Sequence, residues 1–219
     1  GCYAVFHALQ IADALCRSDE SARVLIVSVE LCTLHFQSRD ESDILLANAL
    51  FSDGSASALV VSDKIAADLP GKPALNIRGF GSYVLQKGKQ DMGWDISYDG
   101  FIMSLSSAIP DLIQDNISEV AGKVMDTYDL TPSDIAHWAI HPGGRKILTA
   151  IQSALNLPAS ALDVSKKILA DYGNMSSATI LFVLKEMLDN AGEFNSGDTI
   201  FSAGFGPGLS LESAIFTYD

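Results

Sequence analysis

The first sixty positions show two kinds of hydrophobic pattern, one typical of helices and one typical of strands. Residues 3 to about 17 are rich in apolar side chains and predict a helix. Residues 23–29 form a near-continuous apolar run, which is typical of a strand buried on both faces. A short helix at about 43–50, a turn at 52–54 and a strand at 57–61 follow. The order helix, strand, helix, strand predicts half of a layered α/β unit.

Charged and turn-forming residues replace apolar ones between positions 62 and 73, most clearly in Pro70-Gly71-Lys72-Pro73. We therefore predict two halves, residues 1–70 and residues 71–219. The second half is expected to contain strands at 75–80, 100–105, 137–140, 199–203 and 209–216, an exposed polar turn at 86–93, and helices reaching Tyr128 and at 144–155, 160–170 and 176–191. The pattern as a whole predicts an α/β protein.

Composition narrows the classes of function. The chain has 219 residues, of which 48% are hydrophobic and 19% charged, so it can bury a substantial core. The formal net charge of -13 argues against nucleic acid as a partner, and an anionic ligand would need a local basic patch. No apolar run approaches the roughly 18 to 20 residues that span a bilayer.

The cysteines are few and scattered. Three of them, with no CxxC pair and no cluster with histidine, fit neither a secreted disulfide framework nor a metal site. We expect a cytoplasmic protein without a bound metal. Cys16 lies among polar residues on the first predicted helix and is expected to be structural.

Three residues could form a thiol-based site. Cys2 directly precedes an alanine-containing helix, where free N–H groups and the helix dipole are expected to lower a thiol pKa. His141 ends a predicted strand before Pro142-Gly143-Gly144, and Asn174 stands where a helix begins. Each also has a plain structural interpretation, as a buried cysteine, a satisfied polar residue and a helix N-cap. Together they are the types needed to attack an acyl thioester and stabilise the resulting oxyanion.

The glycine-rich segment Gly204-Phe205-Gly206-Pro207-Gly208 has one misleading feature. It looks like a dinucleotide-binding loop, but that motif requires a helix after the glycines. Residues 209–215 instead alternate as a strand does. The segment is therefore interpreted as backbone scaffolding near a site.

These segments, in this order, resemble the type III polyketide synthases, which are the chalcone synthase-like enzymes of the thiolase superfamily. The resemblance runs from Cys2 to the last strand. It implies a layered αβαβα thiolase-like fold whose halves are pseudo-twofold repeats, although no internal repeat is evident. In this family the nucleophilic cysteine lies mid-chain after a core strand. We therefore expect the chain to be the second part of a longer enzyme.

The resemblance also implies roles for individual residues. Cys2 would be the nucleophile, while His141 would stabilise its thiolate and polarise the extender carbonyl, and Asn174 would donate to the enolate oxygen. Phe51 would guard the mouth of the site and promote malonyl decarboxylation by excluding water. Met103 stands in place of a second gatekeeping phenylalanine.

Other positions would set substrate specificity. Cys32 and His35 replace threonines that line the cavity of plant members, which favours fatty acyl starters over plant-like flavonoid specificity. Ser176, Gly206 and Pro207 are expected beside the substrate. Arg145 and Lys146 are the expected contacts for coenzyme A phosphates, with Lys166 and Lys167 as alternatives that a solvated helix face explains equally well.

The implied activity is acyl transfer. An acyl group from acyl-CoA would load onto Cys2, and malonyl-CoA would then be decarboxylated and joined to it in repeated Claisen condensations before cyclisation to an alkylresorcinol, alkylpyrone or chalcone type of product. Coenzyme A thioesters are the expected substrates, no cofactor is expected to stay bound, and a homodimer is expected. One alternative is a β-ketoacyl-acyl-carrier-protein synthase III, which performs one condensation; Phe51 and the glycine-rich loop argue against it. The other alternative is a noncatalytic fragment or dimer scaffold, suggested by the start at Gly1.

Overall fold

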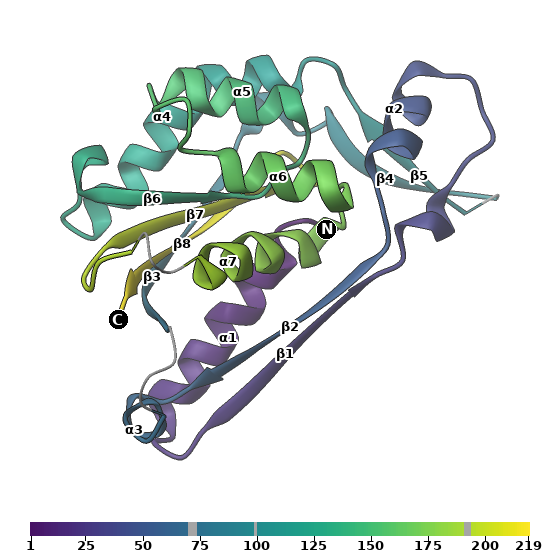
Figure 1. Ribbon diagram of the computed structural model, residues 1–219. Coiled ribbons are helices and arrows are strands. Elements are labelled where there is room, and N and C mark those ends of the chain that lie inside the picture. Colours follow the sequence, from purple (N-terminus) through teal and green to yellow (C-terminus); the bar gives the residue numbers. More distant parts are fainter. Residues whose placement is uncertain (70–73, 99, 191–193) are drawn as a thin grey trace.

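The computed structural model describes residues 1–69, 74–98, 100–190 and 194–219. Two sheets form its framework (Figure 1). The smaller sheet pairs β1 (Arg23–Glu30) with β2 (Gly54–Val61) in antiparallel register. The larger sheet has the order β3 (Leu75–Val84), β8 (Ser210–Tyr218), β7 (Thr199–Gly206), β6 (Ile135–Ile140), in which only β6 and β7 run parallel. The segment Pro70–Pro73, where the boundary between halves was predicted, lies outside the described residues.

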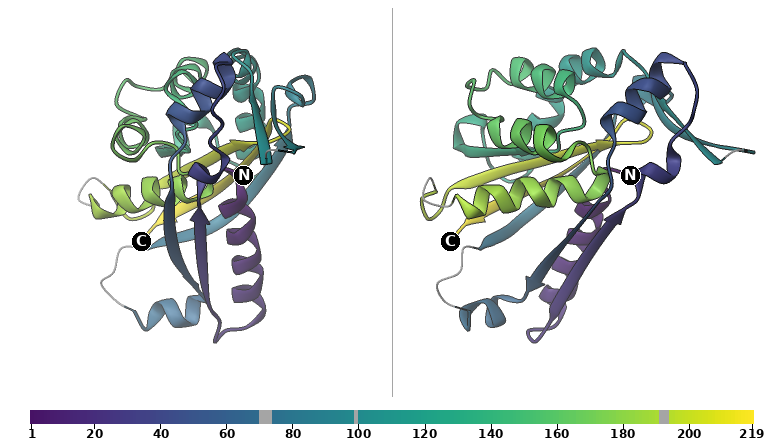
Figure 2. Two further views of the ribbon diagram at one scale, coloured as in Figure 1. Left: turned by 90° about the vertical axis from the view of Figure 1, so that its right-hand side faces the viewer. Right: turned by 45° about the vertical axis from the view of Figure 1, so that its right-hand side comes forward.

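Two helices form a layer between the sheets, as Figures 1 and 2 show. They are α1 (Ala4–Ser18) and α7 (Thr179–Asp189). Their apolar side chains join the inner face of the small sheet and one face of the large sheet in a single core, which includes Phe6, Leu9, Ile26, Ile180, Val183, Ile200 and Phe216. This central layer places the beginning of α1 against the end of β7.

Further helices cover the other face of the large sheet. α4 (Ile109–Thr127) presents buried isoleucines at Ile109, Ile113 and Ile117, four residues apart as one helix face requires. α5 (Arg145–Ala154) packs beside it, and α6 (Asp163–Tyr172) lies between α5 and α7. The resulting order of layers is sheet, helix, sheet, helix.

An extension at one end completes the fold. It contains the 3-10 turn η1 (Cys32–His35), α2 (Ser42–Leu50) and the hairpin of β4 (Met92–Ser97) and β5 (Gly100–Leu105), which packs against α2 (Figure 1). The remaining elements are short: α3 (Asp63–Ala67), η2 (Gln86–Gly88), η3 (Pro132–Asp134) and η4 (Ser176–Ala178).

The predicted elements are confirmed in type and order, with two errors in the second half. Residues 86–93 were predicted as an exposed turn, but Gly88 is buried and β4 begins at Met92. The helix predicted from 176 begins as α7 only at Thr179, because Ser176 has a φ of 50°, in the left-handed region, and starts a 3-10 turn instead.

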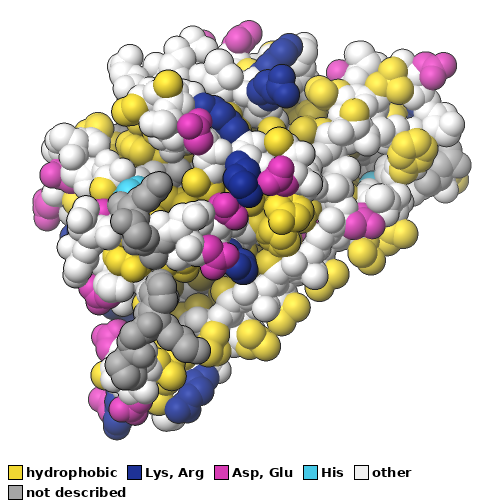
Figure 3. Space-filling model, viewed as in Figure 1, with side chains coloured by type: hydrophobic (Ala, Val, Ile, Leu, Met, Phe, Trp, Pro, Cys, Tyr) yellow, Lys and Arg dark blue, Asp and Glu magenta, His cyan; other side chains and the backbone are white. Residues whose placement is uncertain are grey.

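The small sheet shows a third difference. β1 was predicted to be buried on both faces, yet only its inner residues such as Ile26 and Ser28 are buried. On the outer face Leu25, Val27 and Val29 are 63%, 62% and 60% exposed. Figure 3 shows apolar side chains along this edge of the molecule. The outer face is therefore apolar but has no covering layer among the residues that the structure describes.

Candidate active site

Cys2 lies directly before the first turn of α1, with Tyr3 as the N-cap. Its Sγ is 4.0 Å from Oδ1 of Asn174. Burial raises the pKa of the Cys2 thiol, and the nearby charge of Glu30 adds to this, although hydrogen bonds with the side chains of Ser176 and Asn174 oppose it. The expected lowering of the Cys2 pKa is thus wrong for this structure, because desolvation of the thiol outweighs the groups that lower its pKa.

His141 follows β6 and is only 1% exposed. Its backbone N–H donates to the carbonyl of Ala203 at 2.8 Å, which fixes the residue at the end of the large sheet. Neither ring nitrogen has a hydrogen-bond partner among the described residues. Burial lowers the pKa of His141 to about 4, so the ring is neutral near pH 7 and offers one donor and one acceptor. Unpartnered buried nitrogens of this kind are rare outside functional sites.

Asn174 is held by backbone hydrogen bonds in both directions. Its N–H donates to the carbonyl of Leu50, and its own carbonyl accepts from the N–H of Ser52, each at 2.9 Å. The side-chain Oδ1 accepts from the N–H of Ser176 at 2.9 Å, while Nδ2 lies 3.5 Å from the carbonyl oxygen of Gly143. Asn174 is therefore not the N-cap of α7, which is Ala178; it stabilises the turn two residues ahead. Its amide nitrogen remains available as a donor.

These three side chains line one cavity of about 100 Å³. Most of the other predicted site residues line it too: Phe51, Met103, Cys32, His35, Ser176 and Pro207. Cavity residues that the sequence analysis did not predict as site residues are Gly1, Glu30, Thr33, Phe36, Ala47, Asn48, Met92, Trp94, Leu105, Gly143, Ile147 and Phe205. The cavity thus combines a small polar centre with a largely apolar wall.

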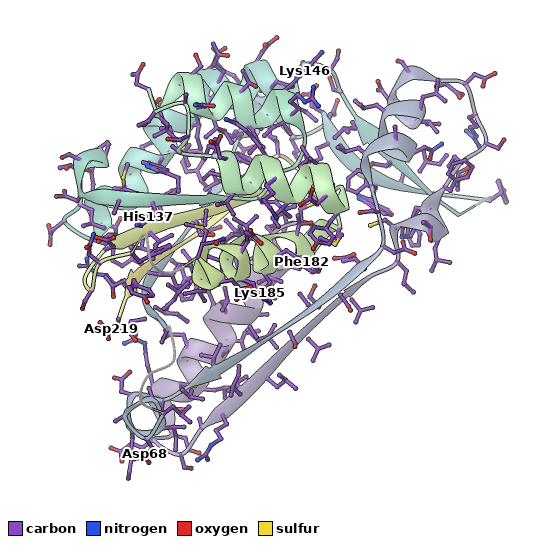
Figure 4. All side chains as sticks on the ribbon, viewed as in Figure 1. Asp68, His137, Lys146, Phe182, Lys185 and Asp219 are labelled. Atoms are coloured by element: carbon purple, nitrogen blue, oxygen red, sulfur yellow. The ribbon has the colours of Figure 1, made fainter. Side chains whose placement is uncertain are left out.

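Three predicted residues lie outside the cavity lining. Gly206 lies against Tyr3, because a Cβ there would be 2.2 Å from the Tyr3 ring, so its role is close packing beside the nucleophile. Arg145 and Lys146 are exposed at the start of α5, and no ion pair is found for either among the described residues. They lie in sequence between two cavity residues, Gly143 and Ile147. Figure 4 shows the position of Lys146.

The alternative cations, Lys166 and Lys167, are paired. Lys166 Nζ lies 3.1 Å from a carboxylate oxygen of Asp163, and Lys167 Nζ lies 3.1 Å from Asp171 and 3.3 Å from Glu186. These contacts fit the solvated helix face that the sequence also allowed. Arg145 and Lys146 are left as the stronger candidates for an anionic ligand.

Two side chains missed by sequence reasoning shape the cavity. Trp94 lies with its ring centroid 4.4 Å from that of His35, edge to face, and it was missed because no strand was predicted between residues 80 and 100. Glu30 accepts from the backbone N–H of Ser177 at 3.2 Å and from the Ser177 hydroxyl, which also contacts the hydroxyl of Ser28. A carboxylate at the end of an apolar strand, two residues before Cys32, was the available signal.

The Cys32 thiol differs from an activated nucleophile. Burial, together with the charge of Glu30, raises the pKa of Cys32 to about 12. The thiol is therefore neutral across the physiological range. In this cavity Cys32 is a small, weakly polar part of the wall.

Two models of known protein-family domains match this chain. The model of the chalcone and stilbene synthase N-terminal domain matches residues 1–64, and that of the C-terminal domain matches residues 63–217. The chain belongs to the chalcone and stilbene synthase family. It is therefore a member of the type III polyketide synthases, and its layered α/β structure is of the thiolase-like class.

Individual relatives agree. The chain is 34% identical to a Bacillus subtilis (strain 168) protein named "Putative chalcone synthase", covering all of this chain and 60% of that protein. The crystal structure of PKS-I from the brown alga Ectocarpus siliculosus superposes with a TM-score of 0.91 at 25% identity, covering all of this chain and 58% of that one. The C-terminal type III polyketide synthase domain of Steely1, a type I/III hybrid from Dictyostelium, gives a TM-score of 0.83 at 26% identity, covering 99% and 59%. The chain thus spans about three fifths of the length of these family members.

Two further observations concern the described part of the chain. None of its helices is both long and apolar enough to cross a membrane. Within the same residues, no three side chains of His, Cys, Asp or Glu gather as metal ligands would.

Proposed function

We propose that the protein containing this chain is a type III polyketide synthase that loads an acyl group from acyl-CoA onto Cys2 and extends it with malonyl-CoA. The observation that carries this proposal is the meeting of Cys2, His141 and Asn174 at one cavity. Cys2 Sγ lies 4.0 Å from Asn174 Oδ1, and the ring nitrogens of His141 have no partner among the described residues. Both observations support a site whose polar groups can contact a substrate. Family membership supports the same conclusion.

In acyl loading, the sulfur of Cys2 attacks the thioester carbonyl. The new bond joins Cys2 Sγ to the acyl carbon, and the bond from that carbon to the coenzyme A sulfur breaks. Because the Cys2 pKa is raised and the His141 ring is neutral, the acceptor nitrogen of His141 takes the thiol proton as attack proceeds. The proton then passes to the departing coenzyme A thiolate.

Extension uses the same polar centre. Loss of CO₂ from malonyl-CoA breaks a carbon–carbon bond and leaves its electron pair as an enolate on the thioester oxygen. The N–H of His141 and the Nδ2–H of Asn174 are the donors for this oxygen. The enolate carbon then attacks the acyl carbon on Cys2 and releases the Cys2 thiolate, which can enter another round.

The apolar wall favours decarboxylation and aliphatic substrates. Phe51 lies close to Asn174, since the two residues form an isolated β-bridge, and its ring lines the cavity. A carboxylate placed there loses hydration, which disfavours its charged form. Met103, Cys32 and His35 line the same space, and we infer that they accept long fatty acyl starters.

Substrate delivery and assembly complete the proposal. Arg145 and Lys146, exposed and adjacent to a cavity residue, would hold coenzyme A phosphates against a chain whose net charge is -13. A homodimer in the cytoplasm is the expected form, and no cofactor need remain bound.

Product analysis tests this function against the alternative of a single condensation. The full-length protein, incubated with long-chain acyl-CoA and malonyl-CoA, should release products of two or more condensations, detected by liquid chromatography and mass spectrometry. A single condensation product formed with an acyl-carrier protein as the required acceptor would instead indicate the β-ketoacyl synthase III reaction. Absence of any condensation product would favour the noncatalytic alternative.

A further inference from the structure

A second polar cluster lies between α1, the helix that follows Cys2, and the large sheet. Glu212 of β8 is a buried carboxylate, only 4% exposed, in the middle of the large sheet. Its Oε1 accepts a hydrogen bond from the Ser82 hydroxyl at 2.6 Å and lies 3.8 Å from Nε2 of His7 on α1. Its Oε2 is buried without a hydrogen-bond partner in the described part of the chain. A buried carboxylate is costly without polar contacts, and among the described residues Ser82 and His7 supply the contacts to Glu212 from β3 and α1.

The register of the sheet connects this carboxylate to the active site. Glu212 is the cross-strand neighbour of Gly204 on β7, so both point to the same face. A Cβ at Gly204 would lie 3.4 Å from Cβ of His141 and 3.7 Å from the carbonyl oxygen of Cys2. The Glu212 side chain therefore projects from the sheet on the face that supports both Cys2 and His141.

The contacts continue to the residue beside the nucleophile. The His7 ring meets the ring of Tyr3 edge to face, with centroids 5.5 Å apart. Tyr3 is the N-cap of α1 and packs on Gly206. The sequence of contacts Glu212, His7, Tyr3 thus ties the first turn of α1 to the large sheet one residue after Cys2.

We propose that Glu212 and His7 are a pair of positioning residues that hold the first turn of α1 and thereby keep the partly buried Cys2 in its reactive orientation. This inference rests on the proposed function where acyl loading is concerned, but not where the burial of the Cys2 thiol is concerned. Loss of the pair loosens the turn and lets water reach the thiol. The loosened thiol loses the burial that raises its pKa, so it becomes easier to alkylate and worse placed for acyl transfer.

The test compares variants of the full-length protein. We expect Glu212→Gln and His7→Gln each to speed alkylation of Cys2 by iodoacetamide about fivefold at pH 7, followed by peptide mass spectrometry, and to move its pH profile to lower pH. Acyl loading should slow about tenfold in both. Ser82→Ala should change both rates in the same directions by less, and His7→Lys, which places an ammonium group beside the carboxylate, should keep wild-type values.

A matched control comes from the same sheet. His137 and Asp198 form another histidine–carboxylate pair, 3.0 Å apart and partly buried. His137 lies near the start of β6 (Figure 4), whereas His141 of the cavity follows the end of this strand. Asp198→Asn should leave Cys2 alkylation unchanged even if it lowers the melting temperature. An equal acceleration in Asp198→Asn, or a wild-type alkylation rate in Glu212→Gln, would overturn the inference. Because alkylation needs no acyl-CoA, a wild-type protein that fails to load acyl groups would contradict the proposed function and leave this comparison intact.

Discussion

The two sheets of this molecule have similar apolar strands but different surroundings. The four-stranded sheet has helices on both faces, and β7 is buried along its whole length. The sheet of β1 and β2 has its inner face against α1 and α7, whereas Leu25, Val27, Val29 and Leu59 are exposed on its outer face. An apolar run therefore indicates that a strand is suited to burial on both faces. It does not indicate that the described residues include elements that cover both of those faces.

The active site lies where these unequal regions meet. His141 and Asn174 come from the well-packed second half, while Cys2, Cys32 and Phe51 come from the half with the bare sheet face. The geometry of the nucleophile should consequently be more sensitive to what covers the small sheet than the geometry of the histidine.

The largest expected effect follows from the exposed outer face of the small sheet. A protein consisting of residues 1–219 alone should show no measurable turnover and should associate in sedimentation velocity experiments, because an exposed apolar sheet face favours binding to another apolar surface. Val27→Lys should reduce this association in the 219-residue protein but destabilise the full-length protein. A 219-residue monomer with normal turnover would contradict the comparison.

A second prediction concerns the well-packed half of the site. His141→Gln and Asn174→Ala should each lower malonyl-CoA decarboxylation by about 10² or more, since each removes a donor to the enolate oxygen. His137→Gln, which changes a partly buried histidine in β6, the strand that leads to His141, should retain wild-type decarboxylation. An unchanged rate in either site variant would remove that residue from the catalytic centre.

The pH dependence of stability should also report on His141. Its pKa of about 4 in the folded protein, against an ordinary value of 6.5, means that the unfolded chain gains a proton before the folded one does as the pH falls. Stability should be fully present above pH 6.5 and decrease down to about pH 4, by about 3 kcal/mol from this residue. Urea unfolding of wild type and His141→Gln at several pH values measures the difference. Identical pH profiles for the two proteins would show that His141 is not buried in the neutral form.

The smallest expected effect is on substrate choice. Met103→Phe should shift the preference among acyl-CoA starters toward shorter chains by about 1 to 3 kcal/mol in relative kcat/KM, because a rigid ring takes space from an adaptable side chain. Competition assays with starters of several lengths give the profile, and Cys16→Ala, on the far part of α1, provides a neutral control. An unchanged profile would show that Met103 does not form part of the acyl channel.

Local patterns of the sequence predicted most helices and strands and the three polar residues at the centre of the cavity. The other features of the site depend on contacts between residues that are distant in sequence. The apolar runs of β1 and β7 and the four-residue spacing in α4 are visible along the chain. Trp94 was missed because β4 is stabilised by pairing with β5 and not by a repeating local pattern. The raised pKa of Cys2 could not be foreseen, since it arises from desolvation of the thiol in the folded chain and from the charge of Glu30, which is distant in sequence.

The central claim is that Cys2 is the nucleophile of an acyl-loading site, and intact-protein mass spectrometry tests it most directly. Full-length wild-type protein and the Cys16→Ala control, incubated with acyl-CoA without malonyl-CoA, should each gain the mass of one acyl group, and peptide mapping should place that group on Cys2. Cys2→Ala should gain none while keeping its circular dichroism spectrum, because the change removes the thiol and little volume. An adduct of equal yield on Cys2→Ala would contradict the account.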